Sequence, residues 1–160
     1  MGPIAVTVSP ETSLEEAAEL FASKGLLGAP VLDESDRLLG TLTETDIVRF
    51  VRREFHGLPR FRFVTWRARV RDMVRFLERR SPDLAFRIRT RLRATKTRQL
   101  VDGDRLIAGP DDAFDAVGRY MVDTKTTLVP VVEGGRLVGT VDYDMVRSVV
   151  RQELGDAMSG

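Results

Sequence analysis

The apolar residues of this chain recur at two spacings, and the changes from one to the other mark the predicted helices and strands. An apolar run at 4–8 predicts a strand, and apolar residues every three or four positions from Leu14 onward predict a helix. Two further runs, 29–32 and 37–42, predict strands joined by a polar turn. Helical spacing returns over 44–54, so the first third of the chain has the order strand, helix, strand, strand, helix.

The last third of the chain repeats that order. Residues 105–108 predict the first strand, and helical spacing begins again at Phe114. Strands are predicted at 127–132 and 136–141, joined by two glycines that are typical of a hairpin. A final helix is expected from about Tyr143. Because a unit of about 50 residues buries little apolar surface alone, we expect the two copies to pack on one another.

We therefore predict an α/β (α+β) fold in which two β-α-β-β-α repeats pack as a pseudo-two-fold pair around an inserted segment. The predicted boundaries are 1–54 for the first repeat, 55–100 for the insert, 101–154 for the second repeat and 155–160 for a flexible tail.

Charge separates the insert from the repeats. The whole chain has 25 Lys+Arg and 24 Asp+Glu, a formal net charge of +1. Residues 55–100 hold 14 basic and three acidic residues, a net charge of +11, so the remainder carries −10. Six of the eleven aromatic residues also lie in the insert, interleaved with arginine.

Two elements are predicted inside the insert. Apolar spacing predicts a helix over about 66–79, and Ser81-Pro82-Asp83 marks a new start. Residues 84–93 alternate strictly, which favours a strand over a helix. That strand would place Leu84, Phe86, Ile88 and Leu92 on one face and the basic side chains on the other. The basic side chains are Arg87, Arg89, Arg91 and Arg93.

These arginines allow more than one function. They could bind nucleic acid, with guanidinium groups on phosphates and aromatic rings on bases. They could equally pair with the acidic repeats, within the chain or across a dimer, or bind a partner protein.

Two motifs of the repeats point to a known family. The first repeat contains Gly28-Ala29-Pro30-Val31-Leu32-Asp33 and then Gly40-Thr41-Leu42-Thr43-Glu44-Thr45-Asp46. With these motifs, both repeats resemble CBS (cystathionine-β-synthase) domains, which occur as tandem pairs called Bateman modules. The second repeat keeps Leu128-Val129-Pro130-Val131-Val132-Glu133. Its signature, Gly139-Thr140-Val141-Asp142-Tyr143-Asp144, is one residue short and has aspartate where threonine is expected.

The resemblance implies a regulatory module that binds AMP, ADP, ATP or S-adenosylmethionine in the cleft between paired repeats. It assigns Leu27, Ala29, Pro30, Val31, Thr43 and Asp46 to the site in the first repeat, and Val129, Pro130 and Asp144 in the second. A carboxylate three residues after a strand-end threonine can accept hydrogen bonds from ribose hydroxyls. The apolar strand residues would support the adenine. The same spacing is also a capping box, so Thr43 and Asp46 could instead only cap a helix.

Catalysis has little support in the sequence. The chain has no cysteine, a single histidine, His56, and no phosphate-loop or nucleophile-elbow motif. No apolar run is long enough to span a bilayer. We therefore expect a cytoplasmic, homodimeric, non-enzymatic protein without a metal. The alternatives are a nucleic-acid-binding protein whose repeats serve as a dimerisation scaffold, and an adaptor that regulates a separate enzyme or transporter.

Overall fold

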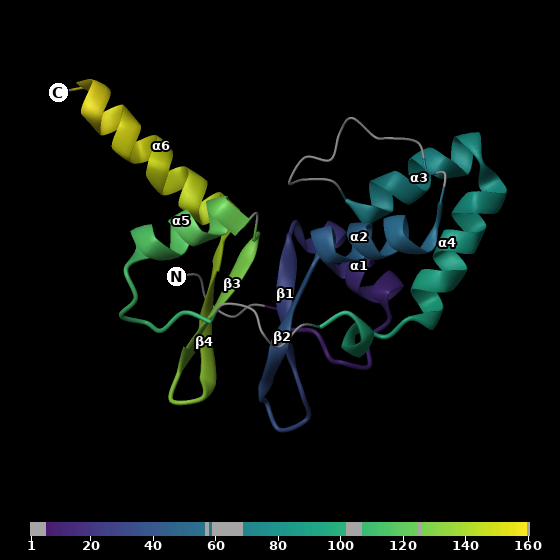
Figure 1. Cartoon of the computed structure of the whole chain (residues 1–160), viewed down its shortest axis with the longest axis horizontal. Helices are drawn as coiled ribbons and strands as arrows, with labels where there is room; N and C mark the ends of the chain where they lie inside the picture. The colour runs from purple at the N-terminus through teal and green to yellow at the C-terminus, as the bar shows by residue number, and fades with distance from the viewer. Residues whose placement is uncertain (1–5, 57, 59–68, 102–106, 125, 160) are drawn as a thin grey trace. The chain divides into compact units, whose positions relative to one another are not determined.

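The computed structural model describes residues 6–56, 58, 69–101, 107–124 and 126–159. These residues form two compact units, one within 6–105 and the other within 106–160 (Figure 1). The described part of the insert belongs to the first unit. It is therefore not the separate segment between two repeats that the charge pattern predicts.

The first unit contains the predicted elements of the first repeat. They are α1 (Leu14–Lys24), β1 (Gly28–Leu32), β2 (Leu38–Thr43) and α2 (Glu44–Glu54). The side chain of Ser13 caps α1 by accepting a hydrogen bond from the backbone nitrogen of Glu16 at 3.1 Å. Gly25 ends α1 in the left-handed conformation that favours glycine, with φ of 67°. Within the predicted strand 4–8, Val8 forms a single parallel bridge with Val31, and residues 4 and 5 lie outside the described residues.

Strands β1 and β2 form an antiparallel pair with two different faces. Ala29, Val31 and Leu42 point into the hydrophobic core of the unit. Because successive side chains in a strand alternate in direction, the opposite face carries Gly28 and Pro30, paired with Thr43 and Thr41 respectively. A Cβ on Gly28 would lie only 2.5 Å from the carbonyl oxygen of Leu42, so this close approach of the two strands requires glycine.

The insert forms a helical hairpin of α3 (Val70–Arg80) and α4 (Pro82–Ala94). The predicted strand over 84–93 is therefore wrong. Ala85, Ile88 and Leu92 fall on one face of the helix and are buried, whereas Phe86 is 71% exposed. Burial of this face against the rest of the unit decides between the two periods, since the alternating arginines fit either. The predicted helix over 66–79 is confirmed from Val70 onward, and residues 66–68 lie outside the described part.

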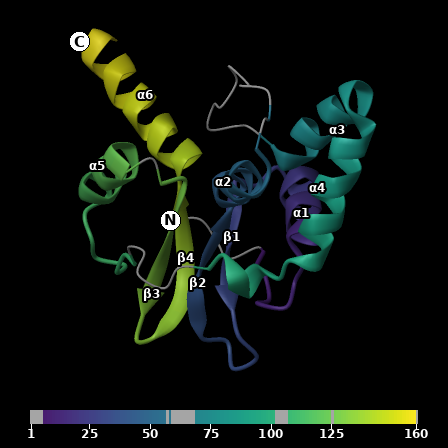
Figure 2. The ribbon, with the colours of Figure 1, turned by 45° about the vertical axis from the view of Figure 1, so that its right-hand side comes forward.

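The hairpin completes the core of the first unit. Its buried residues belong to the same cluster as those of α1, α2 and the strands, and they are Val70, Val74, Leu77, Ala85, Ile88 and Leu92. Figures 1 and 2 both place α3 and α4 alongside α1. After α4 the chain returns to the start of α1, where the backbone nitrogen of Leu14 donates to the carbonyl of Thr95 at 2.9 Å and Thr97 donates to the carbonyl of Thr12 at 2.8 Å.

The second unit repeats the order of the first. It contains α5 (Phe114–Thr124), β3 (Leu128–Glu133), β4 (Arg136–Asp142) and α6 (Tyr143–Ser159). Its core is smaller and consists of Ala108, Val117, Met121, Val129, Val131, Val141 and Val146. Ala108 makes a parallel bridge with Val131, and residues 105 and 106 of the predicted strand lie outside the described residues.

Two further findings concern the chain ends and membranes. Helix α6 continues to Ser159 and so extends through residues 155–159 of the predicted tail. None of the helices in the described ranges has the length and apolar character that crossing a bilayer would require.

Candidate functional site

Thr43 and Asp46 meet at the junction of β2 and α2, where they form a capping box. The hydroxyl of Thr43 accepts a hydrogen bond from the backbone nitrogen of Asp46 at 3.2 Å. Oδ2 of Asp46 accepts one from the backbone nitrogen of Thr43 at 2.9 Å. The two side chains are 2% and 8% exposed. The capping role that the sequence left open is therefore confirmed, and the two functional groups lie side by side.

The face of the sheet that leads to this junction carries a polar group that the sequence did not single out. Thr41 is paired with Pro30 and lies two residues before Thr43, on the same face of β2. It is 1% exposed, and its hydroxyl has no hydrogen-bond partner among the described residues. A buried hydroxyl without a partner is uncommon and calls for an explanation. The place of Thr41 in the motif gave no sign of this property.

The strand residues predicted to support the adenine do not all lie on the sheet face that carries Thr41 and Thr43. Ala29 and Val31 contribute their side chains to the hydrophobic core of the unit, and Leu27 is buried just before β1. The carbonyl of Leu27 accepts a hydrogen bond from the backbone nitrogen of Glu44 at 2.9 Å. Among the predicted strand positions, Pro30 is the one that shares its sheet face with Thr41 and Thr43.

The second unit presents different groups at the corresponding positions. Strand pairing matches Leu128 to Gly28 and Asp142 to Thr43, and each helix begins at the next residue. Asp142 caps α6 by accepting a hydrogen bond from the backbone nitrogen of Met145 at 2.8 Å. Met145 therefore stands where the first unit has Asp46, and Asp144 lies one position too early.

The other residues predicted in the second unit lie on β3. Val129 is fully buried in the core of the unit, and Pro130 is paired with Thr140. The predicted site residues of the second unit thus keep the strand pattern of the first without its carboxylate.

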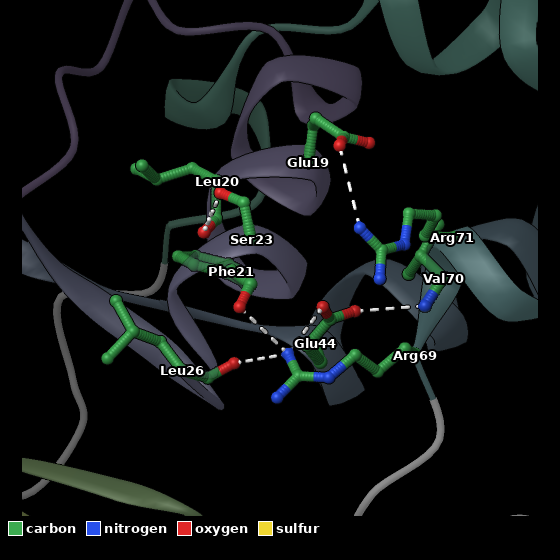
Figure 3. A network of polar contacts seen from close by, with 9 residues as sticks. All are labelled: Glu19, Leu20, Phe21, Ser23, Leu26, Glu44, Arg69, Val70 and Arg71. Atoms are coloured by element: carbon green, nitrogen blue, oxygen red, sulfur yellow. Dashed lines mark hydrogen bonds and ion pairs between the residues drawn. The ribbon is translucent and has the colours of Figure 1, made fainter.

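A buried carboxylate next to the capping box joins the repeat to the insert (Figure 3). Glu44, the first residue of α2, is 2% exposed. Its Oε2 accepts a hydrogen bond from the backbone nitrogen of Val70 at 3.0 Å, and its Oε1 pairs with Nη1 of Arg69 at 3.3 Å. The same guanidinium nitrogen donates to the carbonyls of Phe21 at 3.0 Å and Leu26 at 2.5 Å.

Burial has the largest effect on the pKa of Glu44. Desolvation raises the pKa of its carboxyl group above the usual value, while the hydrogen bond from Val70 and the charge of Arg69 act in the opposite direction. The sequence does not reveal this group, because a glutamate in the first turn of a helix is usually a solvated partner of the helix dipole.

The four arginines proposed to bind nucleic acid surround α4 rather than sharing one face. Arg91 pairs with Glu54 at 3.4 Å, and Arg93 pairs with Glu15 at 3.2 Å. Arg89 pairs with Glu78 within the hairpin, and the guanidinium of Arg87 lies over the ring of Phe55 at 5.7 Å. The alternative that these arginines pair with the acidic first repeat is therefore confirmed for Arg91 and Arg93.

A groove of about 390 Å³ lies between α1, α3 and α4, away from the capping box. Its rim combines Arg71, Arg89 and Arg93 with three glutamates of α1, so the charges compensate. In the part of the chain that the structure describes, no three His, Cys, Asp or Glu side chains are grouped as a metal site would require.

The order of elements, repeated in both units, is that of the CBS-domain fold. Residues 1–53 match the family model described as CBS domain, and the chain has the fold of a CBS-domain pair. In sequence, it is 40% identical over 60 residues to inosine-5′-monophosphate dehydrogenase of Aquifex aeolicus, a match that covers 38% of this chain but only 12% of that enzyme. It is 25% identical over 153 residues to an uncharacterised protein of Methanocaldococcus jannaschii, covering 91% of this chain and 86% of that protein.

Three solved structures illustrate the fold. The CBS domain of a CBS-domain-containing membrane protein from Sphaerobacter thermophilus has a TM-score of 0.65 at 20% identity, covering 92% of this chain and 87% of that one. CBSX2 in complex with AMP has a TM-score of 0.62 at 21% identity, with coverages of 95% and 93%. A CBS-domain pair in complex with 5′-methylthioadenosine and S-adenosyl-L-methionine has a TM-score of 0.60 at 18% identity, with coverages of 96% and 91%.

Proposed function

We propose that this chain is a non-catalytic regulatory module whose first repeat binds an adenosine ligand: AMP, ADP, ATP or S-adenosylmethionine. The observation that supports this most directly is the polar face of β1 and β2, where the hydroxyls of Thr41 and Thr43 lead to the carboxylate of Asp46. Two proteins with the same fold hold adenosine compounds of this kind. Ligand binding regulates only if the ligand has different affinities for two states of the module.

The chemistry of these groups suits a nucleoside. An ionised carboxylate has about four acceptor positions, so Asp46 can cap its helix and also accept hydrogen bonds from a ribose. The hydroxyl of Thr43 accepts one hydrogen bond in the capping box and still has a proton to donate. A ligand that bonds to Thr41 would remove the cost of a buried hydroxyl without a partner, which is about 1–3 kcal/mol.

We further propose that each chain carries one functional site of this type. In the second unit Met145 replaces the carboxylate, and a thioether is only a weak acceptor. The bulk of Leu128 also replaces Gly28 at the sheet edge. The second repeat then serves as a structural counterpart of the first.

The test is calorimetric titration of AMP, ATP and S-adenosylmethionine into the full chain. Loss of a hydrogen bond to a charged group predicts that Asp46→Ala weakens binding by about tenfold or more. Asp144→Ala, which removes the carboxylate that the motif assigns to the second unit, serves as the matched control and should bind as the wild type does. Absence of binding at millimolar ligand, or an unchanged affinity of Asp46→Ala, would overturn the proposal.

A further inference from the structure

Glu44 lies within the Thr43–Asp46 capping box in sequence, but its side chain makes its contacts with the insert. Figure 3 shows its carboxylate between the start of α3 and the end of α1. One oxygen accepts the first backbone N–H of α3, from Val70, and the other meets the guanidinium of Arg69. The first residue of α2 and the first residue of α3 are thus joined by a single side chain.

Arg69 extends this junction to a third helix. Its Nη1 donates to the carbonyls of Phe21 and Leu26, which lie in the last turn of α1 and just beyond it. A cation is favourable there because it lies at the negative end of the α1 helix dipole. The end of α1, the first turn of α2 and the start of α3 therefore meet at one ion pair, in which Glu44 is 2% and Arg69 is 19% exposed.

This junction differs from the other ion pairs between insert and repeat. The pairs Arg91–Glu54, Arg93–Glu15 and Arg71–Glu19 have partly or mostly exposed side chains. Exposed pairs are screened by solvent and contribute little. The Glu44–Arg69 pair is costlier to break, because separation leaves the buried Glu44 carboxylate without compensation in a region of low dielectric. A displacement of the α2 N-terminus is therefore transmitted to α3 at Glu44 rather than at the exposed pairs.

We propose that Glu44 is a positioning residue that couples the Thr43–Asp46 junction to the α3–α4 hairpin. The hairpin is then the element of the module that responds to the ligand site. This inference rests on the proposed function for the identity of the ligand, while the coupling itself is a property of the unliganded chain. At the corresponding position the second unit has Tyr143, which carries no charge of this kind.

The coupling is tested first without a ligand, by NMR hydrogen exchange of the Val70 amide relative to the amides of α4. Asp46→Ala removes half of the capping box and should speed Val70 exchange by about fivefold or more. In a Glu44→Gln background the same substitution should change Val70 exchange by less than about twofold. Glu54→Gln makes the same charge change on the same helix at an exposed pair, and in that background the full effect should persist.

Glu44→Gln keeps the size and shape of the side chain and removes its charge, so we expect it to fold; Arg69→Gln is a second variant with the same expected loss of coupling. The proposal is overturned when Asp46→Ala has no effect on Val70, or an equal effect in the wild-type and Glu44→Gln backgrounds.

A second arm adds AMP, ATP or S-adenosylmethionine at saturating concentration. A ligand that binds should change Val70 exchange in the wild type and in Glu54→Gln, but not in Glu44→Gln. Ligand binding without any change in the exchange rate of the Val70 amide overturns the coupling. Failure of all three ligands to bind overturns the proposed function instead, and the ligand-free arm then decides the coupling by itself.

Discussion

The two units of the chain share one order of elements and differ in chemistry at the junction of sheet and helix. Both units bury small and medium-sized apolar residues at corresponding positions of their strands and helices. At the junction, however, Gly28, Thr43 and Asp46 of the first unit correspond to Leu128, Asp142 and Met145 of the second. Both copies keep the positions that pack the core and cap the helix, whereas the Thr43–Asp46 pair occurs only in the first.

The second helix of the repeat ends differently in the two units. Helix α2 ends at Glu54 and Phe55 leaves the helical conformation, just before Gly57 and Pro59 in the sequence. Helix α6 continues to Ser159. The first unit thereby gains a helical hairpin that covers α1 and supplies six residues to its core.

The largest expected effect concerns this hairpin. Ile88→Ala should destabilise the first unit by about 2–5 kcal/mol, because it empties a fully buried position. Phe86→Ala is the matched control, since the strand interpretation would have buried both residues on one face; its exposed side chain predicts a change within about 0.5 kcal/mol. Urea unfolding monitored by peptide-resolved hydrogen exchange measures the change in stability caused by each substitution. Equal costs for the two substitutions would contradict the helix.

A second substitution transfers a residue of the second unit to the first. Gly28→Leu should cost roughly 1–3 kcal/mol, because the new Cβ meets the backbone of Leu42 at 2.5 Å and of Thr43 at 2.9 Å. Gly155→Ala in α6 should instead stabilise by up to about 1 kcal/mol, since its Cβ meets nothing within 4 Å. Chemical denaturation gives both values. A Gly28→Leu variant as stable as the wild type would show that the sheet edges of the two units are interchangeable.

Thr41→Val separates stability from binding at the proposed site. Replacing a buried hydroxyl that lacks a partner by a methyl group of similar shape should stabilise the unliganded chain by about 1 kcal/mol. The same substitution should lower the affinity for the adenosine ligand measured by calorimetry. Thr140→Val, at the corresponding position of the second unit, provides the control for binding and should leave the affinity unchanged. Unchanged affinity in Thr41→Val would remove this hydroxyl from the site.

The smallest expected effect is the pH dependence of stability that Glu44 gives the first unit. Because burial raises the pKa of Glu44, the folded chain holds this proton more tightly than the unfolded chain. The contribution of Glu44 to stability is therefore fully present below about pH 4 and is lost as the pH rises through the raised value. The free energy of unfolding of the wild type, relative to Glu44→Gln, should fall from about pH 4 upward. A free-energy difference between the wild type and Glu44→Gln that grows as the pH rises would contradict this expected direction.

Much of the repeat could be predicted from sequence, because its elements are amphipathic and locally marked. The helix over 44–54 and the two strand pairs appear where apolar spacing and turn residues predict them. The error at 84–93 has a definite cause. Arginine at every second position is equally compatible with a strand and with an exposed helix, and burial of Ala85, Ile88 and Leu92 by residues distant in sequence decides the outcome.

The candidate site was predictable only in part. The Thr43–Asp46 pair follows from a motif with fixed spacing, but Thr41 is distinguished by its missing partner, which is a property of the folded chain. The Glu44–Arg69 pair joins residues 25 positions apart, and neither residue type is unusual at its place in the sequence. The one-residue deletion in the second copy was visible, whereas its consequence, methionine in place of aspartate, required the strand register.

The basic α3–α4 hairpin is an integral part of the first unit. Native-state hydrogen exchange of the full chain at increasing urea tests it most directly, because each amide reports the free energy of the opening that exposes it. We expect the amides of Leu77 and Ile88 to open together with that of Phe21 in α1, with one free energy and one urea dependence. Exchange of the α3–α4 amides at a clearly lower free energy, while α1 stays protected, would contradict it.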